Sequence, residues 1–180
     1  MLLGLVGSEM CIRDSDMGGT TAKITIIENQ KAIKAREFEV DRKARFKKGS
    51  GLPLRIPVIE MVEIGAGGGS IARVNKLEQI ITGPDSAGSN PGPACYSNGG
   101  VNPTITDADL VIGKIDADKF AGGKINLSKE FAKNAITKNI SDKLNIKTET
   151  AALAISEIVD ETMSNAARVH TVEQGHETSN

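Results

Sequence analysis

Hydrophobic and polar residues alternate along the first part of the chain. Ala22, Ile24 and Ile26 alternate with more polar neighbours, which predicts a β-strand with one buried face. The polar stretch Glu28–Lys31 then predicts a turn into a return strand, so that the two strands form a hairpin. By the same reasoning we expect strands over 22–27, 32–40, 56–64, 71–74 and 79–82. Ile12–Ser15 is too polar to be the buried end of a strand, and we expect no strand there.

After Pro103 the spacing of the apolar residues changes to every three or four positions, which predicts helices. The first has Thr104 or Thr106 as its expected N-cap, and Asp107 and Asp109 lie in its first turn, where negative charge is favourable. Ser128 is the expected N-cap of a second helix, which runs to about residue 144.

The longest helix is expected to start at Thr148 or Thr150 and to end before Gly175. Its buried face is predicted to hold Ala152, Ile155, Ile158, Val159, Thr162, Met163, Ala166 and Val169. Strands followed by helices predict an α/β fold, of the kind found in an α+β half-domain.

Composition narrows the function classes. The 180 residues suffice for one domain, and 39% hydrophobic with 25% charged residues is typical of a globular protein rather than a membrane protein. A net charge of −1, no Trp and one Tyr give no reason to expect nucleic acid or a membrane as partner. Two cysteines form no disulfide framework or zinc motif, so we expect a reducing, cytoplasmic setting.

A glycine-containing loop follows residue 15. In Asp16-Met17-Gly18-Gly19-Thr20-Thr21 the two glycines allow backbone N–H groups to approach an anion closely, as in a phosphate nest. Thr20 and Thr21 can add hydroxyl donors, and Lys23 can add positive charge. Asp16 suits a magnesium ion, often through water, because Mg²⁺ combines carboxylates with phosphate oxygens. Taken alone, the pattern also fits an ordinary tight hairpin turn.

Other motifs allow a structural and a functional interpretation. The segment Gly65–Gly69, with Gly67 and Gly68 at its centre, is either a bulge or a contact to a ligand. Cys95 is interpreted as a structural thiol, because no histidine lies near it in the sequence. Asp107 and Asp109 are explained by their place in a helix, and His170 is assigned no role. The segment 83–100 is rich in Gly, Pro and Ser and is expected to be irregular.

The first 15 residues are expected not to belong to the fold. Back-translation of Leu5–Asp14 resembles the transposon-end adapter used to prepare sequencing libraries, read in frame. We therefore predict a non-native leader over 1–15, an incomplete domain over 16–176 and a tail over 177–180.

Several motifs occur in a fixed order: DMGGTTAKI, IPVIEMVEIGAGGGSIARV, GPDSAGSNPGPACY, PTITDADLVIGKI and ARVHTVEQGH. In this order they resemble the hydantoinase A/oxoprolinase family over residues 16–176. The resemblance implies part of an actin-like (ribonuclease H-like) ATPase fold, in which two similar halves enclose ATP. It also implies that Asp16, Gly18, Gly19 and Thr20 form the second phosphate loop and that the glycine-rich segment 65–69 lies near the nucleotide. Pro91–Tyr96 is a hallmark of the family to which the sequence assigns no role.

The family resemblance further implies an ATP- and magnesium-dependent hydrolase that phosphorylates and opens a cyclic amide, such as a hydantoin or 5-oxoproline. Its expected partner is a hydantoinase B-type subunit or domain. Two alternatives stay open: the β-type subunit of a ketone carboxylase, and a non-catalytic actin-like nucleotide-binding module. We expect this chain alone to be inactive, because the resemblance places the first phosphate loop outside it. No catalytic base is identified.

Overall fold

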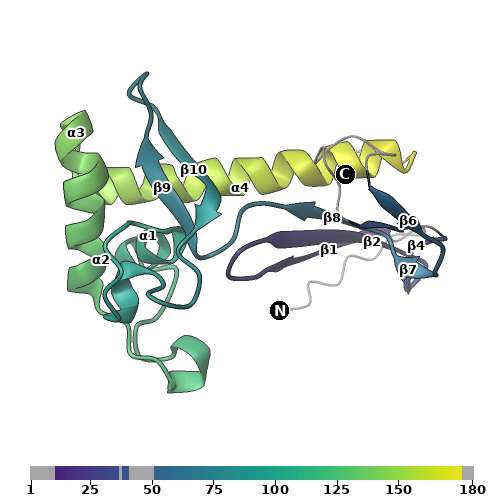
Figure 1. The fold of residues 1–180 in the computed structure, drawn as a ribbon, viewed down its shortest axis with the longest axis horizontal. Coiled ribbons are helices and arrows are strands. Elements are labelled where there is room, and N and C mark those ends of the chain that lie inside the picture. Colours follow the sequence, from purple (N-terminus) through teal and green to yellow (C-terminus); the bar gives the residue numbers. More distant parts are fainter. Residues whose placement is uncertain (1–10, 37, 41–50, 176–180) are drawn as a thin grey trace.

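A computed structural model describes residues 11–36, 38–40 and 51–175. An antiparallel sheet lies at one end and a group of helices at the other, and one long helix runs along both (Figure 1). The strands are β1 (Cys11–Met17), β2 (Ala22–Glu28), β3 (Lys31–Ala32), β4 (Lys34–Ala35), β5 (Phe38–Val40), β6 (Leu52–Leu54), β7 (Val58–Ile59), β8 (Met61–Ile64), β9 (Ser70–Val74) and β10 (Ile80–Ser86). The α-helices are α1 (Ile105–Ile112), α2 (Lys129–Ile136), α3 (Asp142–Leu144) and α4 (Thr148–Glu173).

Strand β2 is the centre of the sheet. It pairs antiparallel with β1 along one edge and with β8 and β3 along the other. Its residues Ala22, Ile24 and Ile26 are buried and alternate with more exposed neighbours, as the sequence pattern predicts. The predicted turn is also present, because Asn29 and Gln30 have the positive φ angles of a two-residue hairpin turn. The predicted return strand, however, is divided into β3, β4 and β5.

The expectation for Ile12–Ser15 was wrong. These residues lie within β1, where Ile12 pairs with Ile27 and Ser15 with Ile24. Among the described strands β1 pairs only with β2, and Asp14 and Ser15 are exposed. An edge strand is held by backbone hydrogen bonds and tolerates polar side chains, so hydrophobicity did not reveal it. Residues 1–10 of the predicted leader lie outside the described residues, and its non-native origin stays a prediction.

A second difference concerns the hairpin of β9 and β10. The predicted strand over 79–82 continues to Ser86, through Gly83 and Pro84 of the segment expected to be irregular. The pairing shifts register between Thr82 and Ser86, which is the irregularity that lets a strand contain glycine and proline.

The helix starts agree closely with the sequence. Thr104 caps α1 and Ser128 caps α2, each accepting a hydrogen bond from the backbone N–H three residues later. A π-helical turn over Thr137–Ser141 connects α2 to α3, so this helix does reach Leu144. Helix α4 begins at Thr148, with Lys147 rather than a threonine as its N-cap.

The buried face of α4 is shorter than predicted. Its first half buries Ala152, Ile155 and Val159 against α1 and α2, whereas Thr162 and Val169 are exposed. The second half lies beyond the helical layer and packs over β2 and β8 instead (Figure 1). Near its end, the Gln174 amide donates a hydrogen bond of 2.7 Å to the Glu60 carboxylate.

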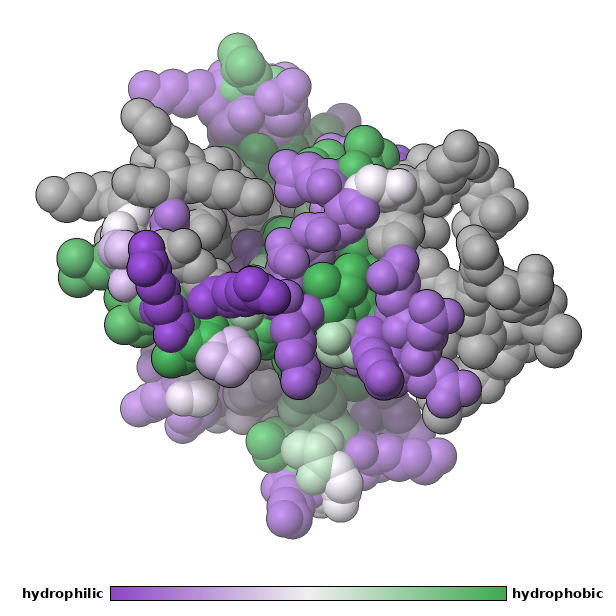
Figure 2. All heavy atoms as spheres, turned by 90° about the vertical axis from the view of Figure 1, so that its right-hand side faces the viewer, coloured by the Kyte–Doolittle hydropathy of each residue, from purple (hydrophilic) through white to green (hydrophobic). Residues whose placement is uncertain are grey.

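The main core therefore lies between α1, α2, α4 and β9. Viewed from the β6–β7 end of the sheet, the surface mixes apolar and polar side chains (Figure 2). The exposed apolar residues between β6 and β8 include Leu52, Leu54, Ile56, Ile59 and Met61. Within the described ranges, no helix is both long and apolar enough to cross a bilayer.

Candidate functional site

The exposed turn over Gly18–Thr21 joins β1 to β2. Gly18, Gly19 and Thr20 are exposed, and the Gly18 N–H donates a hydrogen bond of 2.9 Å to the carbonyl of Thr21, which closes the turn. In Figure 1 this turn points from the sheet toward β9, β10 and α1. The predicted phosphate loop is therefore an accessible turn at the side of the sheet that faces the helical layer.

The glycine-rich segment Gly65–Gly69 lies directly behind this turn. The Gly68 N–H donates to the Gly18 carbonyl at 2.9 Å, and the Gly69 N–H donates to the Gly19 carbonyl at 2.7 Å. A Cβ atom on Gly67 would lie 2.6 Å from the backbone nitrogen of Thr20, closer than a side chain permits. The structure thus brings together two motifs that the sequence separates by more than 40 residues.

These two hydrogen bonds fix which way the peptides of the turn face. In a planar trans peptide the C=O of one residue and the N–H of the next point in opposite directions. Because the carbonyls of Gly18 and Gly19 point toward the glycine-rich segment, the N–H groups of Gly19 and Thr20 point away from it. Open space surrounds the position of a Cβ on Gly19. Two successive N–H groups directed away from the glycine-rich segment are suited to donate to an anion.

The backbone N–H and C=O of Gly68 already have hydrogen-bond partners within the protein. Its N–H bonds to Gly18, and its carbonyl accepts from the N–H of Thr106 at 2.9 Å and from Oγ1 of Thr106 at 2.8 Å. Gly67 donates its N–H to Oγ of Ser70. Gly67 and Gly68 therefore support the turn from behind, and their predicted contact with a ligand stays a prediction.

Charged residues form a row beside the turn. Asp16 of β1 pairs with Lys23 of β2, which in turn pairs with Glu63 of β8. Directly paired residues project on the same face of a sheet, so Lys23 lies between two carboxylates. All three residues are exposed, on the face opposite to the buried Ala22 and Ile24. Sequence reasoning did not identify Glu63, because only strand pairing brings it next to Lys23.

This row fits a magnesium ion that takes most of its ligands from elsewhere. No group of three or more potential metal-binding side chains exists among the described residues. Asp16 is nevertheless two residues from the turn, where one carboxylate could join phosphate oxygens and water around the ion. Asp16, the two outward N–H groups and the exposed Thr20 are together compatible with a magnesium-bound phosphate chain.

Behind the site, a buried carboxylate organises the start of α1. Asp107 is fully buried and accepts from the N–H and hydroxyl of Thr104, both at 2.8 Å. It also accepts from the N–H groups of Cys95 at 2.7 Å and Ala94 at 3.2 Å. Asp107 therefore does more than complement the helix dipole, because it fixes the segment Pro91–Tyr96 against α1. Sequence reasoning had given that segment no role.

Cys95 fits the structural interpretation. The thiol is buried, and burial together with the neighbouring negative charge of Asp107 raises its pKa far above the usual value. Thiolate is the reactive form of cysteine, so this residue is suited to packing rather than to nucleophilic attack.

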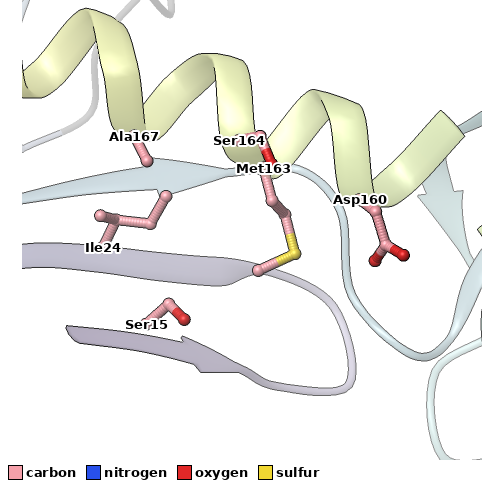
Figure 3. Close-up of a pocket in the computed structure, with 6 residues that line it drawn as sticks. All are labelled: Ser15, Ile24, Asp160, Met163, Ser164 and Ala167. Carbon is pink, nitrogen blue, oxygen red and sulfur yellow. The ribbon is translucent and has the colours of Figure 1, made fainter. Parts of the chain in front are cut away.

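A hollow of about 320 Å³ lies on the other face of the hairpin (Figure 3). Ser15 and Ile24 line it from the sheet. Helix α4 contributes Asp160, Met163, Ser164 and Ala167. Because Ile24 is on the face opposite to Asp16 and Lys23, this hollow is separate from the candidate phosphate site.

The chain is similar to known proteins in both sequence and fold. The family model described as Hydantoinase/oxoprolinase matches residues 2–180. The chain is 36% identical, over 162 residues, to caprolactamase subunit alpha of Pseudomonas jessenii, in a match that covers 90% of this chain and 22% of that protein. It also resembles the structure of nucleotide-free acetone carboxylase, with a TM-score of 0.76, 28% identity and coverage of 92% of this chain and 22% of that one.

The structure of the ATP-dependent caprolactamase from the same Pseudomonas species is similar as well. Its TM-score is 0.70 at 35% identity, and the match covers 89% of this chain. The likeness to both structures confirms the mixed α/β fold class predicted from the sequence. The chain spans 22% of the length of each of these relatives.

Proposed function

We propose, because the chain belongs to the hydantoinase/oxoprolinase family, that it is the phosphate-binding portion of an ATP-dependent enzyme that opens cyclic amides. Family members use ATP to act on cyclic amides or ketones, and the caprolactamase relative acts on a lactam by its name. The observation that carries the proposal is the exposed turn, whose Gly18 and Gly19 carbonyls bond to the glycine-rich segment and so direct the N–H groups of Gly19 and Thr20 away from it.

The residues of this chain would bind and orient the phosphates. The N–H groups of Gly19 and Thr20 would donate to phosphate oxygens, and the hydroxyls of Thr20 and Thr21 would add further donors. Lys23 would balance negative charge, and Asp16 would hold Mg²⁺ directly or through water. Fixed donors of this kind lower the barrier to phosphoryl transfer by stabilising charge on the transferring group.

ATP would supply the activation that an amide lacks. An amide oxygen is a poor leaving group, and its phosphorylation gives a carbon that water can attack. The partner in this proposal is a hydantoinase B-type subunit, consistent with relatives that are named as subunits. A cytoplasmic setting remains part of the proposal.

The second candidate is a ketone carboxylase subunit, favoured by the likeness to acetone carboxylase. There the phosphorylated group would be an enol oxygen rather than an amide oxygen. Two assays of the longer protein carrying this chain, together with its partner subunit, separate the candidates. ATP turnover stimulated by 5-oxoproline, hydantoin or caprolactam supports the first, and turnover stimulated by acetone with bicarbonate supports the second. Nucleotide binding without either would indicate a non-catalytic module.

The site itself is tested by Asp16→Asn, with Asp14→Asn as its matched control. Asp14 is exposed on the same face of β1, two residues farther from the turn. Titration with ATP, with and without Mg²⁺, should show that Asp16→Asn loses the gain in affinity due to the ion while Asp14→Asn keeps it. Equal magnesium dependence in both variants would refute the metal role of Asp16.

A further inference from the structure

Helix α1 is linked to the back of the phosphate turn through Gly68. The carbonyl of Gly68 accepts two hydrogen bonds from Thr106, and its N–H donates to Gly18. A Cβ on Gly68 would lie 2.8 Å from Oγ1 of Thr106, so glycine is needed for this close approach. Thr106, Gly68 and Gly18 thus form a continuous chain of hydrogen bonds from the helix to the turn.

The first turn of α1 is suited to hold these hydrogen-bonded groups in place. N–H groups at a helix start have no partner within the helix. The capping hydroxyl of Thr104 binds the N–H of Asp107, which leaves the N–H of Thr106 for Gly68. The buried carboxylate of Asp107 anchors the same turn, and Ile105 and Ala108 are buried in the core. Thr106, itself only 5% exposed, therefore extends from a rigid element.

The turn in front has one hydrogen bond of its own, from the Gly18 N–H to the Thr21 carbonyl. Gly18, Gly19 and Thr20 are exposed, and glycine leaves the backbone free to adopt other conformations. Its carbonyls stay directed inward only while Gly68 and Gly69 keep their positions. A rotation of those peptides would turn the N–H groups of Gly19 and Thr20 away from an anion.

We propose that Thr106 is a positioning residue, which orients the phosphate-binding N–H groups of Gly19 and Thr20 through Gly68. This inference rests on the proposed function for its ligand. It assigns to the helix start a role in ligand affinity that is separate from its contribution to folding. A preorganised site binds more tightly than a mobile one because less conformational freedom is lost on binding.

A pair of variants isolates the effect of the Thr106 hydroxyl on ligand binding. Thr106→Ser keeps it and Thr106→Ala removes it, while both lose the methyl group. Thr25→Ser and Thr25→Ala form the matched control, because Oγ1 of Thr25 is also partly buried and donates to a backbone carbonyl, that of Glu60, at 2.8 Å. Each variant is made in the longer protein that carries this chain. The variants are compared by urea unfolding, by calorimetric titration with Mg·ATP, by the NMR shifts of the Gly19 and Thr20 amides and by hydrogen exchange of the Gly68 and Gly69 amides.

We expect Thr106→Ala to bind Mg·ATP about fivefold more weakly than Thr106→Ser, the change that loss of one ordinary hydrogen bond produces. The NMR shifts of the Gly19 and Thr20 amides should change, and the hydrogen-bonded Gly68 and Gly69 amides should exchange faster, in Thr106→Ala alone. Thr25→Ala should lose stability without losing affinity. Equal affinities for Thr106→Ala and Thr106→Ser would overturn the proposal.

The failure of the proposed function would look different. In that case the longer protein with unmodified Thr106 would bind no Mg·ATP, and the amide measurements would still decide on positioning. Unchanged Gly19 and Thr20 amides in Thr106→Ala would then refute the role of Thr106 independently of any nucleotide.

Discussion

Gly67 should tolerate no side chain, because it packs directly against the backbone of the phosphate turn. In Gly67→Ala the new Cβ would lie 2.6 Å from N and C of Thr20 and 2.7 Å from N of Thr21. Ordinary carbon contacts begin near 3.5 Å, so the two segments must separate by about 0.9 Å. All three crowded atoms belong to the backbone, and no flexible side chain can move aside to relieve them.

Overpacking of this kind costs about 1–3 kcal/mol of the free energy of unfolding. The separation also stretches the hydrogen bonds from Gly68 and Gly69 to the turn, so affinity for Mg·ATP should fall together with stability. Urea unfolding and calorimetric titration measure the two effects. Gly19→Ala is the steric control, because nothing lies within 4 Å of its Cβ position and its stability should change by less than about 0.5 kcal/mol. The reasoning is refuted if Gly67→Ala unfolds at the same urea concentration as the unmodified chain.

Three further predictions concern the helical layer. Asp107→Asn should lower the free energy of unfolding by about 2–4 kcal/mol, because an amide cannot accept from all of the donors that face the buried carboxylate; a urea midpoint near that of the unmodified chain would contradict this. Cys95 should be alkylated by iodoacetamide far more slowly in the native chain than in guanidinium at pH 8, since burial raises its pKa; peptide mass spectrometry measures this, and equal rates would contradict the described burial. Burial also raises the pKa of Asp109, so its carboxyl binds a proton more tightly in the folded state than in the unfolded state. Ionisation of this carboxyl therefore opposes folding as the pH rises above about 4. Asp109→Asn, which keeps an acceptor for the Ser156 hydroxyl, should therefore gain stability relative to the unmodified chain between about pH 4 and neutrality; a pH-independent difference in urea unfolding would disprove the linkage.

The sequence predicted the elements whose signals are local. Ser128 as a helix cap, the turn at Asn29 and Gln30 and the burial of Ile24 all follow from residue type and spacing over a few positions. The order of motifs also led to the correct family.

Contacts made by backbone atoms were harder to predict. Gly67 packs on Thr20, and Thr106 donates a hydrogen bond to Gly68. Both contacts join segments that are distant in the sequence, and neither produces a regular spacing of apolar residues from which it could be predicted. Edge strand β1 was missed for a related reason, because backbone pairing alone holds it. The glycines did signal a close approach, but they could not indicate which segment would approach.

The length of helix α4 has a consequence for how movement passes from the helical layer to the sheet. It contains 26 residues, which gives a rod of about 39 Å. Its first half is embedded in the helical layer, and its far end is fastened to the sheet through Gln174 and Glu60. For a rod of this length, a tilt of about 5° at the embedded half displaces the opposite end by about 3 Å. Small repacking around Ile155 is thus magnified along the rod into a much larger displacement at the sheet, as a lever magnifies movement.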